Sequence, residues 1–152
     1  MQSSLNRLQQ LYPRREAQAL LRMVVEDVCH ASWTHFVCDG PGTLAGALPD
    51  FHLALERLMA GEPIQYITGR AMFCGREFAV SPATLIPRPE TEDLVAWILA
   101  QACGAAPVCI LDIGTGSGCI AVSLALGLDG SSVTATDISD EALQVAQGNW
   151  KR

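Results

Sequence analysis

The segment DIGTGSG, from Asp112 to Gly118, constrains the fold of this chain more than any other. It follows the almost wholly apolar run VCILDI at 108–113 and precedes a second apolar run, CIAVSLALGL, at 119–128. An apolar strand of this kind is typical of a parallel sheet covered on both faces. Glycines between a strand and a helix let the backbone approach a ligand closely, because no Cβ stands in the way. The sequence therefore predicts a strand, a loop and a helix of an α/β fold.

A second strand and an acidic residue extend this unit. The chain continues with VTATD at 133–137 and with a helical segment at 139–150. Asp137 stands twenty-three residues after Gly114, where its carboxylate can accept hydrogen bonds from both hydroxyls of a ribose. Main-chain N–H groups at the start of the first helix are expected to face the same ligand. We interpret the segment as a nucleoside pocket; the alternative is that Asp137 only caps the next helix, a role that Ser139 could also fill.

The glycine spacing bears on which cofactor would bind. A dinucleotide fingerprint requires a third glycine or alanine at position 119, where this chain has Cys119. The pattern D-x-G-x-G-x-G resembles instead the first motif of S-adenosylmethionine-dependent methyltransferases, whose loop packs along the methionine part of the donor. A NAD-type dinucleotide-binding oxidoreductase and a purely structural glycine turn stay open as alternatives. The resemblance implies donor-binding roles for Asp112, Gly114, Thr115, Gly116, Ser117, Gly118 and Asp137.

Helical periodicity marks the region from Leu5 to Met59. It predicts two amphipathic helices parted by Pro13, a short turn of helix at 32–36 and a longer helix at 48–59. The string DGPG at 39–42 predicts a loop. We therefore expect a small helical bundle.

The composition changes after Pro63. Residues 64–68 have high β-propensity. They are followed by AMFC and EFAV, which stand on either side of Gly75 and Arg76, and this pattern predicts a β-hairpin. The prolines of SPATLIPRPETE predict an irregular linker that leads into a helix with an acidic first turn. The expected domains are a helical domain at 1–62, a hairpin and proline-rich linker at 63–90, and a nucleoside-binding domain at 91–152.

Three strings ahead of the glycine loop narrow the resemblance: GEPIQYITG at 61–69, FCGREFAV at 73–80 and LIPRPETE at 85–92. They resemble the signature blocks of the release-factor glutamine methyltransferases. The resemblance implies an α/β protein with a helical substrate-recognition domain, a β-hairpin linker and the first half of a Rossmann-like class I methyltransferase domain. It implies S-adenosyl-L-methionine as the cofactor. The implied substrate is the glutamine side-chain amide in the Gly-Gly-Gln motif of class I peptide chain release factors, which act in translation termination.

The same resemblance bears on the substrate side of the pocket. Arg88, Glu90 and Thr91 match the family's PRPET segment and are expected at the pocket's edge, although a stiffened linker with an acidic helix start explains them equally well. The family's catalytic Asn-Pro-Pro-Tyr motif has no counterpart up to Arg152. We therefore expect no catalytic residue in this chain and no activity from it alone. A release-factor-binding module without catalysis is the alternative.

Composition argues against several other functions. With 10 Lys and Arg against 16 Asp and Glu, the net charge of -6 disfavours binding to nucleic-acid phosphates. The apolar stretch at 94–113 is interrupted by Gly104 and Pro107, so no membrane span is expected, and the polar N-terminus favours a cytoplasmic protein. The six cysteines lack a CxxC pair and the three histidines share no spacing, which predicts buried reduced thiols and no metal site.

Overall fold

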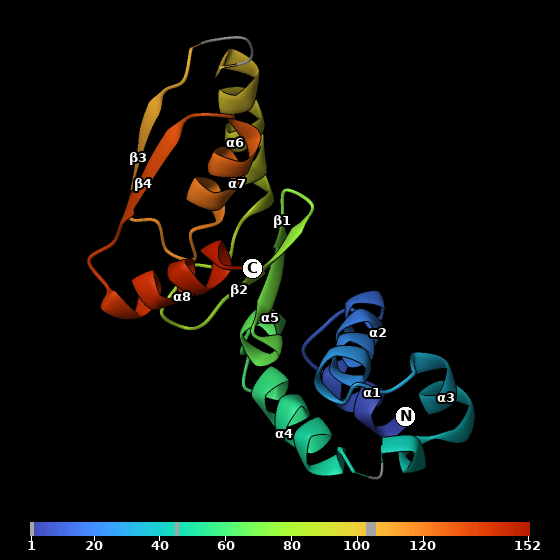
Figure 1. Ribbon diagram of the computed structural model, residues 1–152. Helices are drawn as coiled ribbons and strands as arrows, with labels where there is room; N and C mark the ends of the chain where they lie inside the picture. The colour runs from blue at the N-terminus through green and yellow to red at the C-terminus, as the bar shows by residue number, and fades with distance from the viewer. Residues whose placement is uncertain (1, 45, 103–105) are drawn as a thin grey trace. The chain divides into compact units, whose positions relative to one another are not determined.

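The computed structural model describes residues 2–44, 46–102 and 106–152. The chain divides into two compact units, residues 1–68 and residues 69–152, which we call the first and the second unit. Figure 1 shows helices alone in the first unit and both helices and strands in the second. Within the described ranges, no helix combines the length and the apolar character needed to cross a bilayer. The predicted break at Gly104 lies outside the described residues, as does Cys103.

Pro13 and Gly40 separate the helices of the first unit. Pro13 precedes the first residue of one helix, as predicted, and Gly40 ends another with a φ of 80°, which favours glycine. The loop predicted at 39–42 is partly wrong, because a helix extends to Asp39 and a 3₁₀ turn follows. The elements are α1 (Gln2–Leu8), α2 (Arg14–Met23), the π-helical turn η1 (Val24–Val28), α3 (Trp33–Asp39), the 3₁₀ turn η2 (Pro41–Leu44), α4 (Leu48–Met59) and α5 (Ile64–Thr68).

One apolar core holds the first unit together. Its aromatic centre is formed by Phe36 and Phe51, whose rings lie 5.6 Å apart and are almost fully buried. Around them, α1, α2, η1 and α4 contribute the buried side chains Leu8, Leu21, Val24, Val25 and Leu58. The helical periodicity of the sequence therefore corresponds to a real buried stripe on each helix.

The strand predicted at 64–68 is wrong, because these residues form α5. Ile64 is buried and Ile67 is partly buried, and both pack on the core of the first unit. A helical turn brings two residues three positions apart to the same face, whereas a strand would point them to opposite faces. Packing of this pair on the core thus outweighs the β-propensity of isoleucine, tyrosine and threonine.

The second unit begins with the predicted hairpin, formed by β1 (Arg70–Phe73) and β2 (Arg76–Ala79). The strands are antiparallel, with Arg70 opposite Ala79 and Phe73 opposite Arg76. Cys74 and Gly75 form the two-residue turn with φ angles of 48° and 72°. Positive φ at both central residues matches the twist of a hairpin, so the tight turn determines this register.

The remaining elements of the second unit follow the predicted order. They are α6 (Pro89–Ala102), β3 (Cys109–Ile113), α7 (Cys119–Gly127), β4 (Ser132–Thr136) and α8 (Asp140–Trp150). Strands β3 and β4 are parallel, and Cys109 pairs with Ser132 while Ile113 pairs with Thr136. The C-terminal ends of both strands therefore lie at one edge, next to the glycine loop. The predicted α/β fold class is confirmed: a helical N-terminal region, a hairpin and the start of a Rossmann-like domain.

Only one face of the parallel pair is covered by the described residues. Ile110 packs with Val95 of α6 and Val122 of α7 in a small apolar cluster. Side chains alternate between the faces of a strand, so Leu111 and Ile113 project to the other side, where they are 59% and 77% exposed. The expectation that both faces are covered is therefore wrong for the described residues, in which helices pack against the Ile110 side alone.

Candidate functional site

The glycine loop, residues 114–118, connects β3 to α7 through three left-handed glycines. Gly114, Gly116 and Gly118 have φ angles of 77°, 56° and 77°. Side chains with a Cβ rarely adopt this region, so the alternating glycines are required by the backbone itself. Gly118 also serves as the N-cap residue of α7. The loop therefore turns back on itself before the helix begins, which leaves its outer surface formed by backbone.

The end of β4 holds the loop from one side. The N–H groups of Gly114 and Thr115 both donate to the carbonyl oxygen of Thr136, at 2.8 and 2.9 Å. Within the loop, the Thr115 hydroxyl donates to Oδ2 of Asp112 at 2.7 Å, and Thr115 is buried. Asp112 and the end of β4 thus hold the first half of the loop by direct hydrogen bonds.

The carboxylate of Asp137 is hydrogen-bonded directly to the glycine loop. Its Oδ2 accepts a hydrogen bond from the N–H of Gly116 at 2.8 Å, and its Oδ1 accepts one from the N–H of Ser139 at 3.0 Å. Hydrogen bonds from Ser139 and then Gly116 lower the pKa of the Asp137 carboxyl below its usual value, because they stabilise the charged form. The side chain that caps α8 is that of Ser139, which accepts from the N–H of Ala142 at 3.2 Å.

Most main-chain N–H groups of the glycine loop form hydrogen bonds within the protein. Four of them donate to protein oxygens: Gly114 and Thr115 to Thr136, Gly116 to Asp137, and Gly118 to the carbonyl of Thr115. The N–H of Gly118, the N-cap residue of α7, is therefore engaged within the protein, because the sharp turn lies within reach of the loop itself. The prediction that N–H groups at the helix start face a ligand stays a prediction for the residues that follow Gly118.

The other predicted residues fall into two groups. Ser117 is buried, with 2% of the residue exposed, so it offers almost no surface to a ligand. Arg88 and Glu90 are exposed and Thr91 is half-buried, at the start of α6, where the Thr91 N–H donates to the Arg88 carbonyl at 3.0 Å. Across the described parts of the chain, no hydrogen bond joins these three residues to the glycine loop.

Sequence reasoning missed Asn149, a buried polar residue that contacts the loop. Its side-chain amide lies 2.8 Å from the carbonyl oxygen of Ser117. The signal was present in the sequence, since Ala142, Ala146 and Asn149 recur at helical spacing and form the buried stripe of α8. An asparagine on such a stripe needs a partner inside the protein.

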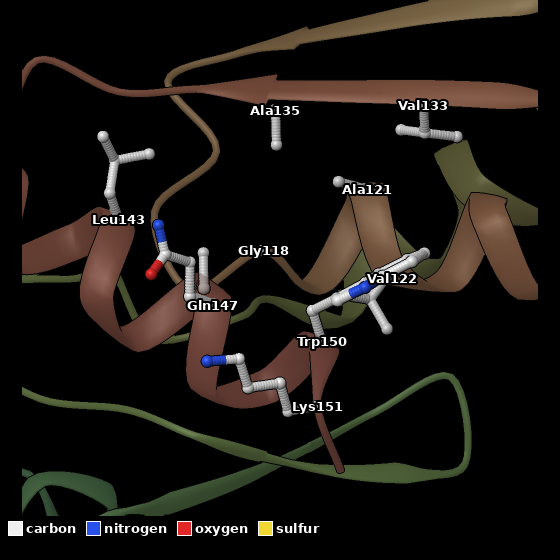
Figure 2. A pocket seen from close by; sticks show the side chains of 10 residues that line it. Gly118, Ala121, Val122, Val133, Ala135, Leu143, Gln147, Trp150 and Lys151 are labelled. Atoms are coloured by element: carbon white, nitrogen blue, oxygen red, sulfur yellow. The ribbon is translucent and has the colours of Figure 1, made fainter.

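A cavity of about 230 Å³ lies on the face of β4 between α7 and α8. Figure 2 shows Ala121 and Val122 of α7, Val133 and Ala135 of β4, and Leu143, Gln147 and Trp150 of α8 around it, together with Lys151, which follows α8. Gly118 is its sole lining residue from the predicted donor site. The cavity is mostly apolar and faces the middle of a strand, so it is distinct from the loop at the strand ends.

The predicted cysteine environment is partly wrong. Of the five described cysteines, all free, Cys119 is buried, whereas Cys38 and Cys109 are exposed. Burial raises the pKa of the Cys119 thiol above its usual value. Within residues 2–44, 46–102 and 106–152, no group of three His, Cys, Asp or Glu side chains is arranged to hold a metal ion.

The parallel strands, the left-handed glycine loop and the acidic residue after the second strand are together typical of the start of a Rossmann-like methyltransferase domain. Comparison with known families agrees. Residues 90–152 match the family model described as ribosomal protein L11 methyltransferase, and residues 2–69 match the one described as PrmC N-terminal domain.

Individual relatives narrow the class. A release factor glutamine methyltransferase of Bacteroides thetaiotaomicron is 44% identical over 144 residues, covering 93% of this chain and 51% of the relative. Relatives of the same name from Koribacter versatilis and Moorella thermoacetica are 56% identical over 99 residues and 41% identical over 141 residues. These alignments cover 65% and 92% of this chain, and 35% and 48% of the relatives. The chain belongs to the release factor glutamine methyltransferase family and spans about a third to a half of the length of these relatives.

Proposed function

We propose that the protein is an S-adenosylmethionine-dependent methyltransferase that modifies the glutamine amide of the Gly-Gly-Gln motif in class I release factors. The observation that carries the proposal is the carboxylate of Asp137, held against Gly116 at the ends of two parallel strands. The names of the relatives, release factor glutamine methyltransferases, support the substrate assignment. Action on release factors would place the protein in the cytoplasm, without direct contact to nucleic acid or membrane.

The residues present fit the donor. Each oxygen of Asp137 accepts one main-chain hydrogen bond and keeps a further lone pair, so the ionised carboxylate can still accept hydrogen bonds from two ribose hydroxyls. The surface of residues 114–118 lets a chain of methylene groups lie directly on the backbone. When bound, the donor would supply an activated methyl group, and the protein's task would be to hold the weakly nucleophilic amide in line with it.

The remaining roles are part of the same proposal. The helical region at 1–62 would recognise the release factor, and 63–90 would link it to a donor-binding domain at 91–152. Arg88, Glu90 and Thr91 would line the edge of the pocket from the start of α6. No catalytic residue is assigned within residues 1–152.

Donor binding tests the proposal. We would titrate S-adenosylmethionine by calorimetry into the 152-residue chain and into a chimera extended after Arg152 with the corresponding residues of the Bacteroides relative. Asp137→Ala should weaken binding by about tenfold or more, because two charge-assisted hydrogen bonds are lost. Asp129→Ala, which removes an exposed acid from the turn before β4, is the matched control.

Two results would contradict the proposal. Unchanged donor affinity after Asp137→Ala would contradict the proposed contact between Asp137 and the ribose. Absence of a methylated glutamine, analysed by mass spectrometry after incubation of the chimera with donor and release factor, would remove the substrate assignment. Uptake of NAD in place of S-adenosylmethionine would favour the oxidoreductase alternative, and release-factor binding without methylation or donor uptake would favour the non-catalytic one.

The lowered pKa of Asp137 predicts how binding depends on pH. A carboxyl whose folded pKa is depressed contributes above its unfolded pKa, and its contribution is lost as the pH falls through the folded pKa. The loss attributable to Asp137→Ala should therefore be the same at about pH 8 and about pH 5.5, since the carboxylate is charged at both. A loss confined to the higher pH would show that Asp137 is not the contact.

A further inference from the structure

Asn149 joins three segments that are far apart in the sequence. Its Oδ1 accepts a hydrogen bond from the N–H of Ala79 at 2.7 Å, and its Nδ2 donates to the carbonyl oxygen of Ala79 at 2.9 Å. The same Nδ2 donates to the carbonyl oxygen of Ser117 at 2.8 Å. Both amide hydrogens and the amide oxygen are thus engaged, which fixes the orientation of the group.

The Asn149 side chain makes the hydrogen bonds to Ala79 that a neighbouring strand would otherwise make. Ala79 ends β2, and the next hydrogen bond of the hairpin runs from the N–H of Val80 to the carbonyl of Gly69, so the N–H and C=O of Ala79 point away from β1. The side-chain amide of Asn149 offers a donor and an acceptor in the arrangement that a strand would offer. It therefore anchors the chain where the proline-rich linker begins.

The contact with Ser117 lies at the turn into α7. Helix α8 approaches the glycine loop closely here, since a Cβ added to Gly118 would lie 3.0 Å from Cβ of Ala146. Ala146 and Asn149 are three residues apart and face the same side of α8. Asn149 is 5% exposed, so its hydrogen bonds are shielded from competing water. Asp112, Thr136 and Asp137 hold the first half of the loop, and Asn149 holds the second half.

We propose that Asn149 is a positioning residue for donor binding, which fixes the Ser117 carbonyl and ties the glycine loop to the start of the proline-rich linker. This inference rests on the proposed function, because it concerns the same loop. It predicts that the loop adopts its donor-binding shape only when residue 149 can donate two hydrogen bonds and accept one.

Asn149→Asp tests the donor requirement with almost no change in shape. A carboxylate would face the carbonyl oxygens of Ala79 and Ser117 without a hydrogen to donate, so affinity for S-adenosylmethionine at about pH 8 should fall by about tenfold or more. A protonated carboxyl can donate one hydrogen bond while accepting from the Ala79 N–H. The loss should therefore shrink at about pH 5.5, because the two facing carbonyls raise the pKa of the introduced group.

Charged groups around this position call for a matched control. Lys151 and Arg152 follow Asn149, and Glu77 of β2 lies 3.7 Å from Arg152. Gln147→Glu places the same change of amide to carboxylate on an exposed position of the same helical turn. It experiences the same cations but contacts neither carbonyl, so we expect donor affinity within about twofold of the wild type at both pH values.

The measurements are donor affinity by calorimetry at both pH values, and amide hydrogen exchange of Ala79 in the donor-free chain. Asn149→Asp should show the pH-dependent loss of affinity, while its carboxyl oxygen can still accept from the Ala79 N–H. Asn149→Leu removes that acceptor, so it should speed exchange at Ala79 and lose affinity equally at both pH values. Equal affinity of Asn149→Asp and wild type, or a loss independent of pH, would overturn the positioning role while the proposed function stands. Failure of the wild-type chain and chimera to bind donor would overturn the proposed function, and unchanged exchange at Ala79 in Asn149→Leu would overturn the role of Asn149 independently.

Discussion

The two units of this chain achieve order by different means. The first unit surrounds one apolar core with helices, and its aromatic pair Phe36 and Phe51 is almost completely buried. The second unit has a smaller apolar cluster and leaves Leu111 and Ile113 of its sheet exposed. Its loop is held by directed polar contacts instead, from Asp112, Thr136, Asp137 and Asn149. Apolar packing tolerates small displacements, whereas hydrogen bonds specify the position of individual atoms. The unit that carries the candidate site relies on the second kind.

The strongest test of this contrast is Phe51→Ala in the first unit. Removing a fully buried ring should lower the free energy of unfolding by about 3–5 kcal/mol, since it forfeits burial and leaves a cavity. We expect hydrogen exchange to rise in residues 1–68 but not at Ala79 or in the glycine loop. Denaturant unfolding with residue-resolved exchange measures both. Equal loss of protection in both units would show that their stabilities are not separate.

Gly118→Ala tests the second unit by geometry rather than by burial. The substitution forces a Cβ into a left-handed backbone and against Ala146, so we expect a loss of about 2 kcal/mol in unfolding free energy together with weakened donor binding. Gly148→Ala is the matched control, because that glycine lies within α8 with nothing within 4 Å of an added Cβ. It should stabilise by about 0.5–1 kcal/mol. Similar effects of the two substitutions would contradict the geometric account.

The smallest effect expected comes from one polar contact within the apolar unit. The Tyr12 hydroxyl donates to the carbonyl oxygen of Leu58 at 3.0 Å, joining the connection between α1 and α2 to α4. Tyr12→Phe should lower the unfolding free energy by about 1 kcal/mol, because one partly buried hydrogen bond is lost. Chemical denaturation is sufficient to measure it. A loss as large as that of Phe51→Ala would mean that polar contacts dominate the first unit too.

The sequence predicted most of the fold because local patterns determine most elements. Pro13 separates two helices, and the apolar run before DIGTGSG forms β3. The strand prediction at 64–68 is wrong, because packing of Ile64 and Ile67 on the core outweighs strand propensity. The prediction that both sheet faces are covered is also wrong for the described residues, because periodicity does not reveal whether another element covers Leu111. Both features depend on contacts between segments that are distant in the sequence, and short stretches of sequence do not reveal these contacts.

The candidate site shows the same limit. The positions of Gly114, Gly116 and Gly118 in left-handed backbone agree with the motif, since glycine spacing is a local property. The bond from Gly116 to Asp137 spans 21 residues, and that from Asn149 to Ala79 spans 70. Neither atom-level pairing can be derived from spacing alone. The donor-binding role of these residues stays a prediction.

The distance in sequence between Asn149 and its partners has a consequence for biosynthesis. Ser117 leaves the ribosome 32 residues before Asn149 does, and Ala79 leaves 70 residues before it. During that interval the nascent loop has no anchor at its second half, although its first half can already contact β4 as soon as Asp137 has emerged. The second half of the loop is therefore fixed after the first half, when the last turn of α8 has formed.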